Sequence, residues 1–83
     1  MRASIESDAM KVRFRLQELL DSRTPPMSQS ELARRSGITL VTINGIANNR
    51  TAMVSLKTLG ALASALGVHP GDLFAVEVRS RKR

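Results

Sequence analysis

A glycine between two short amphipathic segments is the feature that most constrains how this chain can fold. Within residues 29–46, Ala33 lies four positions before Gly37. Glycine accepts the positive φ of a tight turn, and a small alanine lets two helices approach closely. Ser28 and Thr39 are each placed to cap a helix, one on either side of that turn. The spacing therefore predicts a helix-turn-helix, with two helices joined by a short turn at Gly37.

Apolar residues at helical spacing predict further helices on both sides of this unit. A first helix is expected over about 8–21, because the two prolines of the connection at 22–26 cannot continue it. A fourth helix is expected from Ser55, with Gly67 ending it, and a fifth, very short helix is expected to begin at Pro70. The fold class predicted is therefore all-α, a compact bundle of five helices in which helices two and three form the helix-turn-helix.

The folded domain is expected to occupy residues 8–75. A flexible N-terminus is expected at 1–7, and a short strand or a disordered basic tail at 76–83. The net charge is +6, which suits a phosphate-rich partner, but four of the excess cations belong to the tail: Arg79, Arg81, Lys82 and Arg83. Because residues 1–78 carry only about +2, charge indicates nucleic acid without deciding for it.

The composition argues against catalysis and against a membrane location. The 83 residues contain no cysteine, one histidine and seven scattered acidic residues. This set offers no acid–base pair, no nucleophile constellation and no metal cluster, so we expect no enzyme, no cofactor and no bound metal. The apolar runs are too short to span a bilayer, and the N-terminus lacks the apolar core of a secretion signal. A cytoplasmic protein with no membrane partner is expected.

Three stretches of the sequence resemble one known family. They read QSELARRSGIT, TINGIANNR and LKTLGALASALGVHPGDLF. Together they resemble the Cro/cI-type helix-turn-helix regulators, also called the XRE family, over about residues 12–74. The resemblance implies a five-helix bundle of the phage-repressor type. It also implies a partner, double-stranded DNA, read in the major groove by helix three at about 38–48, and a homodimer on half-sites about one helical turn apart.

The resemblance also assigns the DNA-contacting positions. Helix three presents its outward residues to base edges, whereas the start of helix two, the loop after helix three and the start of helix four approach the phosphate backbone. Arg50 is the basic residue most favoured for phosphate. The complete set of expected DNA-binding residues is Gln29, Thr39, Leu40, Val41, Thr42, Asn44, Asn48, Asn49, Arg50 and Lys57.

This chain departs from the family pattern on the reading helix. Leu40 and Val41 stand where familiar members carry polar side chains. An apolar side chain can contact a thymine methyl group but makes no bidentate hydrogen bond to a purine. Asn44 could pair with adenine, and Gly45 is interpreted as removing a side chain from the groove-facing surface. Specificity is therefore expected to depend on thymine contacts and on DNA shape.

Several functional alternatives stay open at this point. The chain is interpreted as a transcriptional regulator, with repression favoured over activation. It could instead be the autoregulatory antitoxin of a toxin–antitoxin pair, with a toxin as protein partner. A third alternative is a protein-interaction module that uses Leu40 and Val41 against another protein. The expected dimer surface is helix five with the residues after it, namely Leu73, Phe74, Val76 and Val78.

Overall fold

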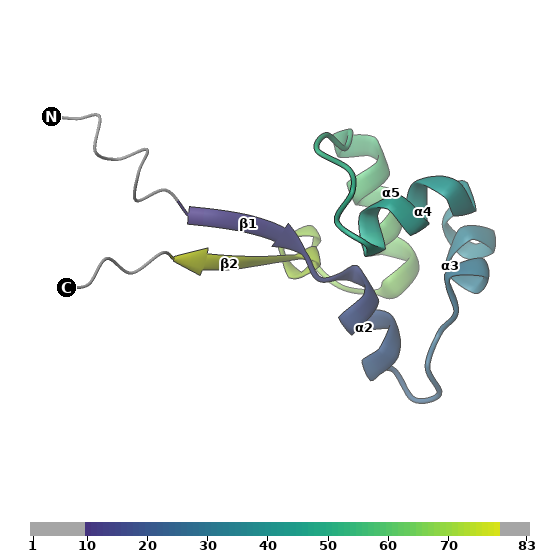
Figure 1. The fold of residues 1–83 in the computed structure, drawn as a ribbon. Helices are drawn as coiled ribbons and strands as arrows, with labels where there is room; N and C mark the ends of the chain where they lie inside the picture. The colour runs from purple at the N-terminus through teal and green to yellow at the C-terminus, as the bar shows by residue number, and fades with distance from the viewer. Residues whose placement is uncertain (1–9, 79–83) are drawn as a thin grey trace, which may run out of the picture.

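A helical body with a two-stranded ribbon projecting from it makes up the fold (Figure 1). The computed structural model describes residues 10–78, so the N-terminus at 1–7 and the basic end of the tail at 79–83 lie outside the described residues. The elements in chain order are β1 (Met10–Phe14), α2 (Leu16–Ser22), α3 (Gln29–Ser36), α4 (Leu40–Ala47), α5 (Leu56–Leu66), the 3-10 helix η1 (Pro70–Leu73) and β2 (Phe74–Val78).

The expected all-α bundle of five helices is wrong, because the described chain has four α-helices and a two-stranded antiparallel sheet. Residues 10–14, expected in the first helix, form β1, and α2 begins only at Leu16. The physical reason is an apolar–charged alternation over 10–14, which suits a strand. Its partner β2 begins 60 residues after the end of β1 and contains a shorter alternation, Val76-Glu77-Val78. The expected fifth helix is a single 3-10 turn at Pro70–Leu73.

The ends of the middle helices follow the predicted capping residues. The side-chain oxygens of Ser28, Thr39 and Ser55 accept backbone N–H bonds at the starts of α3, α4 and α5. Gly37 and Gly67 end α3 and α5 with φ of 78° and 71°. Left-handed backbone of this kind favours glycine because it has no Cβ. The turn between α3 and α4 is therefore fixed by local sequence at both of its sides.

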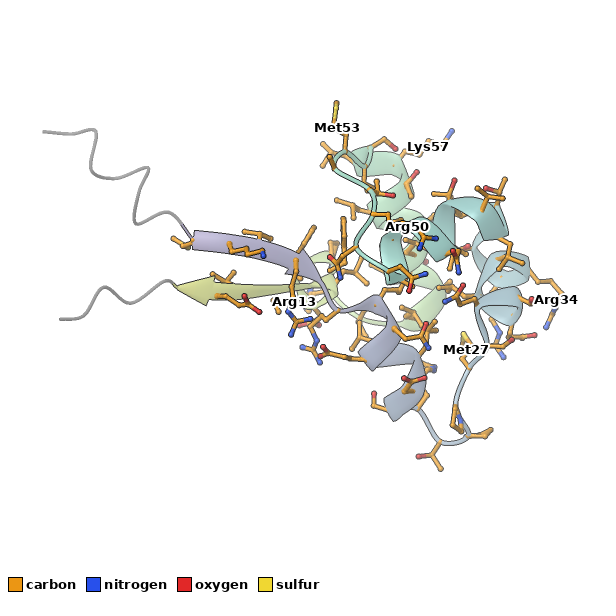
Figure 2. All side chains as sticks on the ribbon, in the orientation of Figure 1. Arg13, Met27, Arg34, Arg50, Met53 and Lys57 are labelled. Atoms are coloured by element: carbon orange, nitrogen blue, oxygen red, sulfur yellow. The ribbon has the colours of Figure 1, made fainter. Side chains whose placement is uncertain are left out.

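The hydrophobic core lies between the helices, and Leu73 of η1 is buried in it. Met27, from the connection before α3, is buried with it and is labelled in Figure 2. Ala33 and Ile38 pack partly buried against this core at the helix-turn-helix. The buried apolar residues are Leu16, Leu20, Met27, Leu32, Ile43, Ile46, Leu62, Ala63, Leu66 and Leu73.

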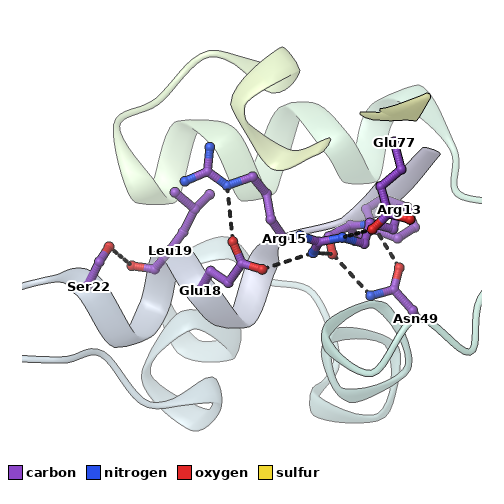
Figure 3. A network of polar contacts seen from close by, with 8 residues as sticks. Arg13, Arg15, Glu18, Leu19, Ser22, Asn49 and Glu77 are labelled. Carbon is purple, nitrogen blue, oxygen red and sulfur yellow. Dashed lines mark hydrogen bonds and ion pairs between the residues drawn. The ribbon is translucent and has the colours of Figure 1, made fainter. Parts of the chain in front are cut away.

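The ribbon is joined to the body at its inner end. Phe14 is paired with Phe74 in the register, and their ring centroids are 5.2 Å apart. Arg13 forms ion pairs with Glu18 of α2 at 2.9 Å and with Glu77 of β2 at 3.2 Å (Figure 3). The hydrogen bond to Glu18 is the main reason that the pKa of Arg13 is raised above its ordinary value. These contacts hold the base of the ribbon against α2.

Candidate nucleic-acid interface

The outward face of α4 carries exposed apolar side chains at its N-terminal end. Ile43 and Ile46 point into the core, which leaves the opposite face to solvent. Val41 is 83% exposed and Leu40 is 45% exposed. Thr39 caps the helix, and its hydroxyl oxygen accepts the Thr42 N–H at 3.3 Å. The sequence-predicted groove-facing residues are therefore presented together at one end of α4.

A chain of side-chain hydrogen bonds crosses from α2 through α3 to α4. Gln29 Nε2 donates to Gln17 Oε1 at 2.8 Å, and Asn44 Nδ2 donates to Gln29 Oε1 at 3.2 Å. The Asn44 carboxamide oxygen in turn accepts a bond from the Arg50 guanidinium at 2.5 Å. Both ends of the Asn44 amide are thus engaged inside the protein. The predicted bidentate pairing of Asn44 with adenine would require these bonds to break first.

A hollow of about 840 Å³ lies between α4, the start of α3 and the loop after α4. It brings together six of the sequence-predicted residues, which are Gln29, Leu40, Val41, Thr42, Asn44 and Arg50. The remaining lining residues are Ser28, Ser30, Gly45, Thr51 and Met53. Apolar side chains on its wall and amide and guanidinium groups beside them give the hollow a mixed character.

Four predicted residues lie outside this hollow. Thr39 caps α4, and Lys57 is exposed in the first turn of α5. Asn48 donates from Nδ2 to the backbone oxygen of Asn44, at the end of its own helix. Asn49 has a positive φ of 56° and its side-chain amide bonds to both backbone groups of Phe14: Oδ1 accepts its N–H at 2.7 Å and Nδ2 donates to its oxygen at 3.0 Å (Figure 3). Asn49 therefore ties the loop to β1.

The structure gives a further reason for glycine at position 45, in the packing of the loop after α4. A Cβ placed there would lie 2.8 Å from the Thr51 hydroxyl oxygen, closer than real Cβ contacts allow. The Arg50 N–H also donates to the Gly45 backbone oxygen at 2.8 Å. The loop after α4 thus folds back over Gly45, and the missing side chain makes room for Thr51.

Met53 is the functional candidate that sequence reasoning missed most clearly. It is absent from the expected DNA-binding residues, but its side chain is 87% exposed and lines the hollow. Figure 2 shows Met53 and Lys57 at the same end of the molecule. Ser30 was missed as well. Helical periodicity could not identify Met53, because its position depends on how the loop folds back at Gly45.

The charge around this face is positive and not balanced by nearby carboxylates along the chain. No acidic residue occurs between Glu31 and Asp72, a stretch that contains α4, the loop and α5. Arg34 and Arg35 both form ion pairs with Glu31. Their hydrogen bonds lower the pKa of Glu31, and the bond from Arg34 has the larger effect. Arg50 also lies in this stretch and lines the hollow. Such a surface suits an anionic partner.

Within residues 10–78, the histidine and acidic side chains form no group of three that could hold a metal ion. Over the same residues, none of the helices has the length and apolar character needed to cross a membrane. The α4 face, with its hollow, is therefore the best-developed candidate site in this part of the molecule.

Comparison with known proteins places the geometry in a family. Residues 15–78 match the model of the Cro/C1-type HTH DNA-binding domain. A segment of 48 residues is 39% identical to the uncharacterized HTH-type transcriptional regulator YozG of Bacillus subtilis (strain 168). That segment covers 58% of this chain and 57% of YozG. The family match spans most of the chain and includes the capped α3–α4 unit, and the chain belongs to the Cro/C1-type helix-turn-helix DNA-binding family.

Proposed function

We propose that this protein is a transcriptional repressor that binds double-stranded DNA and reads the major groove with α4. The observation that carries the proposal is the exposed face of α4 in a positively charged stretch without carboxylates. A major groove about 12 Å wide admits an α-helix, and cations beside it meet the phosphates. Repression would follow from occupying a promoter. Two copies on symmetric half-sites would present one α4 each to successive major grooves.

Base readout in this proposal is mainly apolar. Val41, Leu40 and Met53 lie around the hollow with exposed side chains, and thymine is the base that offers a methyl group in the major groove. Asn44 is bonded to Gln29 and Arg50, so it acts first as a support that fixes the Arg50 guanidinium beside α4. Sequence preference then comes from thymine methyl contacts and from the deformability of the site.

Contacts to the DNA phosphates are assigned to the polar and basic groups around the exposed face of α4. Arg50 and Lys57 supply charge, and the capped N-terminus of α4 at Thr39 directs backbone N–H groups toward an anion. Asn48 is exposed at the end of α4 and can reach the sugar–phosphate backbone of the DNA. Asn49, whose amide is committed to Phe14, is not part of the proposed contact set.

The proposal is tested by selecting duplexes from a random pool and measuring their affinity by fluorescence anisotropy across a salt series. A selected duplex should bind at least about a thousandfold more tightly than a scrambled one, which is the lower end of the range typical of specific binding. Arg50→Ala should weaken both and reduce the salt slope by about one charge. Lys11→Ala, a cation on the ribbon, is the matched control and should change neither. Failure to enrich any duplex would refute the proposal.

Apolar readout is tested separately on the selected duplex. Replacing each thymine with uracil removes the methyl group and leaves base pairing intact. We expect affinity to fall by about three- to tenfold at one or two positions, as contacts worth about 1 kcal/mol would give. Val41→Ser should abolish the difference between thymine and uracil there. If Val41→Ser instead leaves DNA affinity intact and removes a protein partner, the protein-interaction function is favoured.

A further inference from the structure

The methionine side chains in the described part of the chain differ sharply in exposure. Met27 is 8% exposed and belongs to the core, whereas Met10 is 64% exposed and Met53 is 87% exposed. Met10 begins β1, at the outer end of the ribbon. Met53 lies in the loop after α4, and its sulfur points away from the helical body (Figure 2). Among the described methionines, Met53 is therefore the most accessible to a small solute.

Met53 also has the position with the greatest consequence for DNA binding. It lines the hollow beside α4 together with Leu40 and Val41, so its thioether forms part of the apolar surface there. A thioether is apolar and polarisable, and it packs well against methyl groups. Leu40 and Val41 are hydrocarbon side chains that mild oxidants leave unchanged. Among the lining residues, Met53 is the one that an oxygen-donating oxidant converts from apolar to polar.

We propose that Met53 is an oxidation site for hydrogen peroxide and that its conversion to methionine sulfoxide weakens DNA binding. The Met53 sulfur attacks one peroxide oxygen, a sulfur–oxygen bond forms and the oxygen–oxygen bond breaks. The proton of the transferred hydroxyl group passes to the leaving hydroxide, which departs as water. The sulfur is oxidised by two electrons and the peroxide is reduced by two. The inference rests on the proposed function, because it concerns the surface assigned there to thymine contacts.

The effect on binding follows from the polarity of the product. A sulfoxide oxygen accepts hydrogen bonds and donates none. Thymine methyl groups and phosphate oxygens, the DNA groups assigned to this surface, offer it no donor. A bound duplex would therefore bury the new oxygen without a partner, which costs free energy. We expect the affinity for the selected duplex to fall by about three- to tenfold.

The experiment treats the full chain with hydrogen peroxide and locates the added oxygen by peptide mass spectrometry. Affinity for the selected duplex is measured before and after treatment, and each protein is compared with itself. The unaltered chain and Met10→Leu should lose affinity, whereas Met53→Leu should keep its own value although every other methionine is still present. A sulfoxide reductase with a dithiol, which removes the oxygen as water, should restore the unaltered chain. Circular dichroism separates this loss from damage to the core at Met27.

A protection experiment tests the position of Met53 without relying on the affinity change. The selected duplex should slow oxidation of Met53 and leave that of Met10 unchanged, because the DNA covers the hollow and not the end of the ribbon. Absence of any duplex binding before oxidation would refute the proposed function. Once binding is established, three outcomes would overturn this inference alone. They are unchanged affinity after complete oxidation of Met53, an equal loss in Met53→Leu, and oxidation of Met53 at the same rate with and without the duplex.

Discussion

The α3–α4 unit and the β1–β2 ribbon show two different ways of making structure from short segments. The unit covers residues 28–47, and its caps and turn all come from neighbours in sequence. The ribbon pairs Met10–Phe14 with Phe74–Val78, and neither strand has its partner nearby in sequence. An isolated two-stranded ribbon is marginally stable in water. The ribbon therefore depends on packing against the helical body. In the α3–α4 unit, by contrast, local sequence determines the helix ends and the turn, and the core then holds the two helices in place.

The loop after α4 connects the two regions. Asn49 lies just after α4, and its side chain holds the backbone of Phe14 at the end of β1. The orientation of the ribbon relative to α4 is therefore set partly by Asn49, a residue that the sequence analysis predicts to bind DNA.

The largest expected effect is on stability, and it compares a buried residue of the α3–α4 unit with an exposed residue of the ribbon. Ile43 of α4 is fully buried, and Ile43→Ala should lower the free energy of unfolding by about 2–5 kcal/mol. Val12→Ala, on the outer part of the ribbon, should change it by no more than about 0.5 kcal/mol. Urea denaturation followed by circular dichroism measures both. Similar losses for the two variants would show that the ribbon is as strongly packed as the unit.

This contrast explains how much of the fold could be predicted. Caps at Ser28, Thr39 and Ser55 and the terminators Gly37 and Gly67 are local signals, and the structure confirms them. The strand at 10–14 was missed because Val12 and Leu16 also fit a helical period, and periodicity alone does not arbitrate over five residues. Pairing with a strand 60 residues away decides the conformation, and that information is not local.

The next effect concerns the contact between the two regions. Asn49→Gly accepts the positive φ but loses both bonds to Phe14, and should destabilise the fold by about 1 kcal/mol. Asn49→Ala adds the strain of a left-handed alanine and should cost about 1 kcal/mol more. Hydrogen exchange at the Phe14 amide should accelerate in both variants. Asn48→Ala removes only a bond within its own helix end and should leave that amide unchanged.

A smaller effect tests why Gly45 is glycine. Gly45→Ala gains about 1 kcal/mol of helix propensity but meets the Thr51 hydroxyl, so alone it should be neutral or destabilising. Combined with Thr51→Ala, the clash is relieved and the gain should return. The double-mutant cycle should therefore give a coupling of about 1 kcal/mol, measured by thermal unfolding. Additive effects would show that the loop moves freely away from α4.

The same loop explains why the candidate site was only partly predictable. Exposure of Leu40 and Val41 follows from helical geometry once Ile43 and Ile46 are assigned to the core. The engaged amide of Asn44, the exposure of Met53 and the turn of Asn49 toward β1 all depend on the loop conformation. That conformation results from contacts among Gly45, Thr51 and β1, which no helical period encodes.

The smallest expected effect is electrostatic and belongs to the unit alone. Arg34 and Arg35 lower the pKa of Glu31, so its carboxylate is charged in the folded state at pH values where it is protonated when unfolded. This contribution to stability is present above the ordinary pKa of an unfolded glutamate and is lost as the pH falls through the lower pKa of the folded state. NMR titration should show Arg34→Ala raising that pKa more than Arg35→Ala. Lys57→Ala, a cation of α5, should leave the titration unchanged. Equal titration of Glu31 in all four proteins would mean that these exposed pairs are solvated and that the unit is held by its caps and core alone.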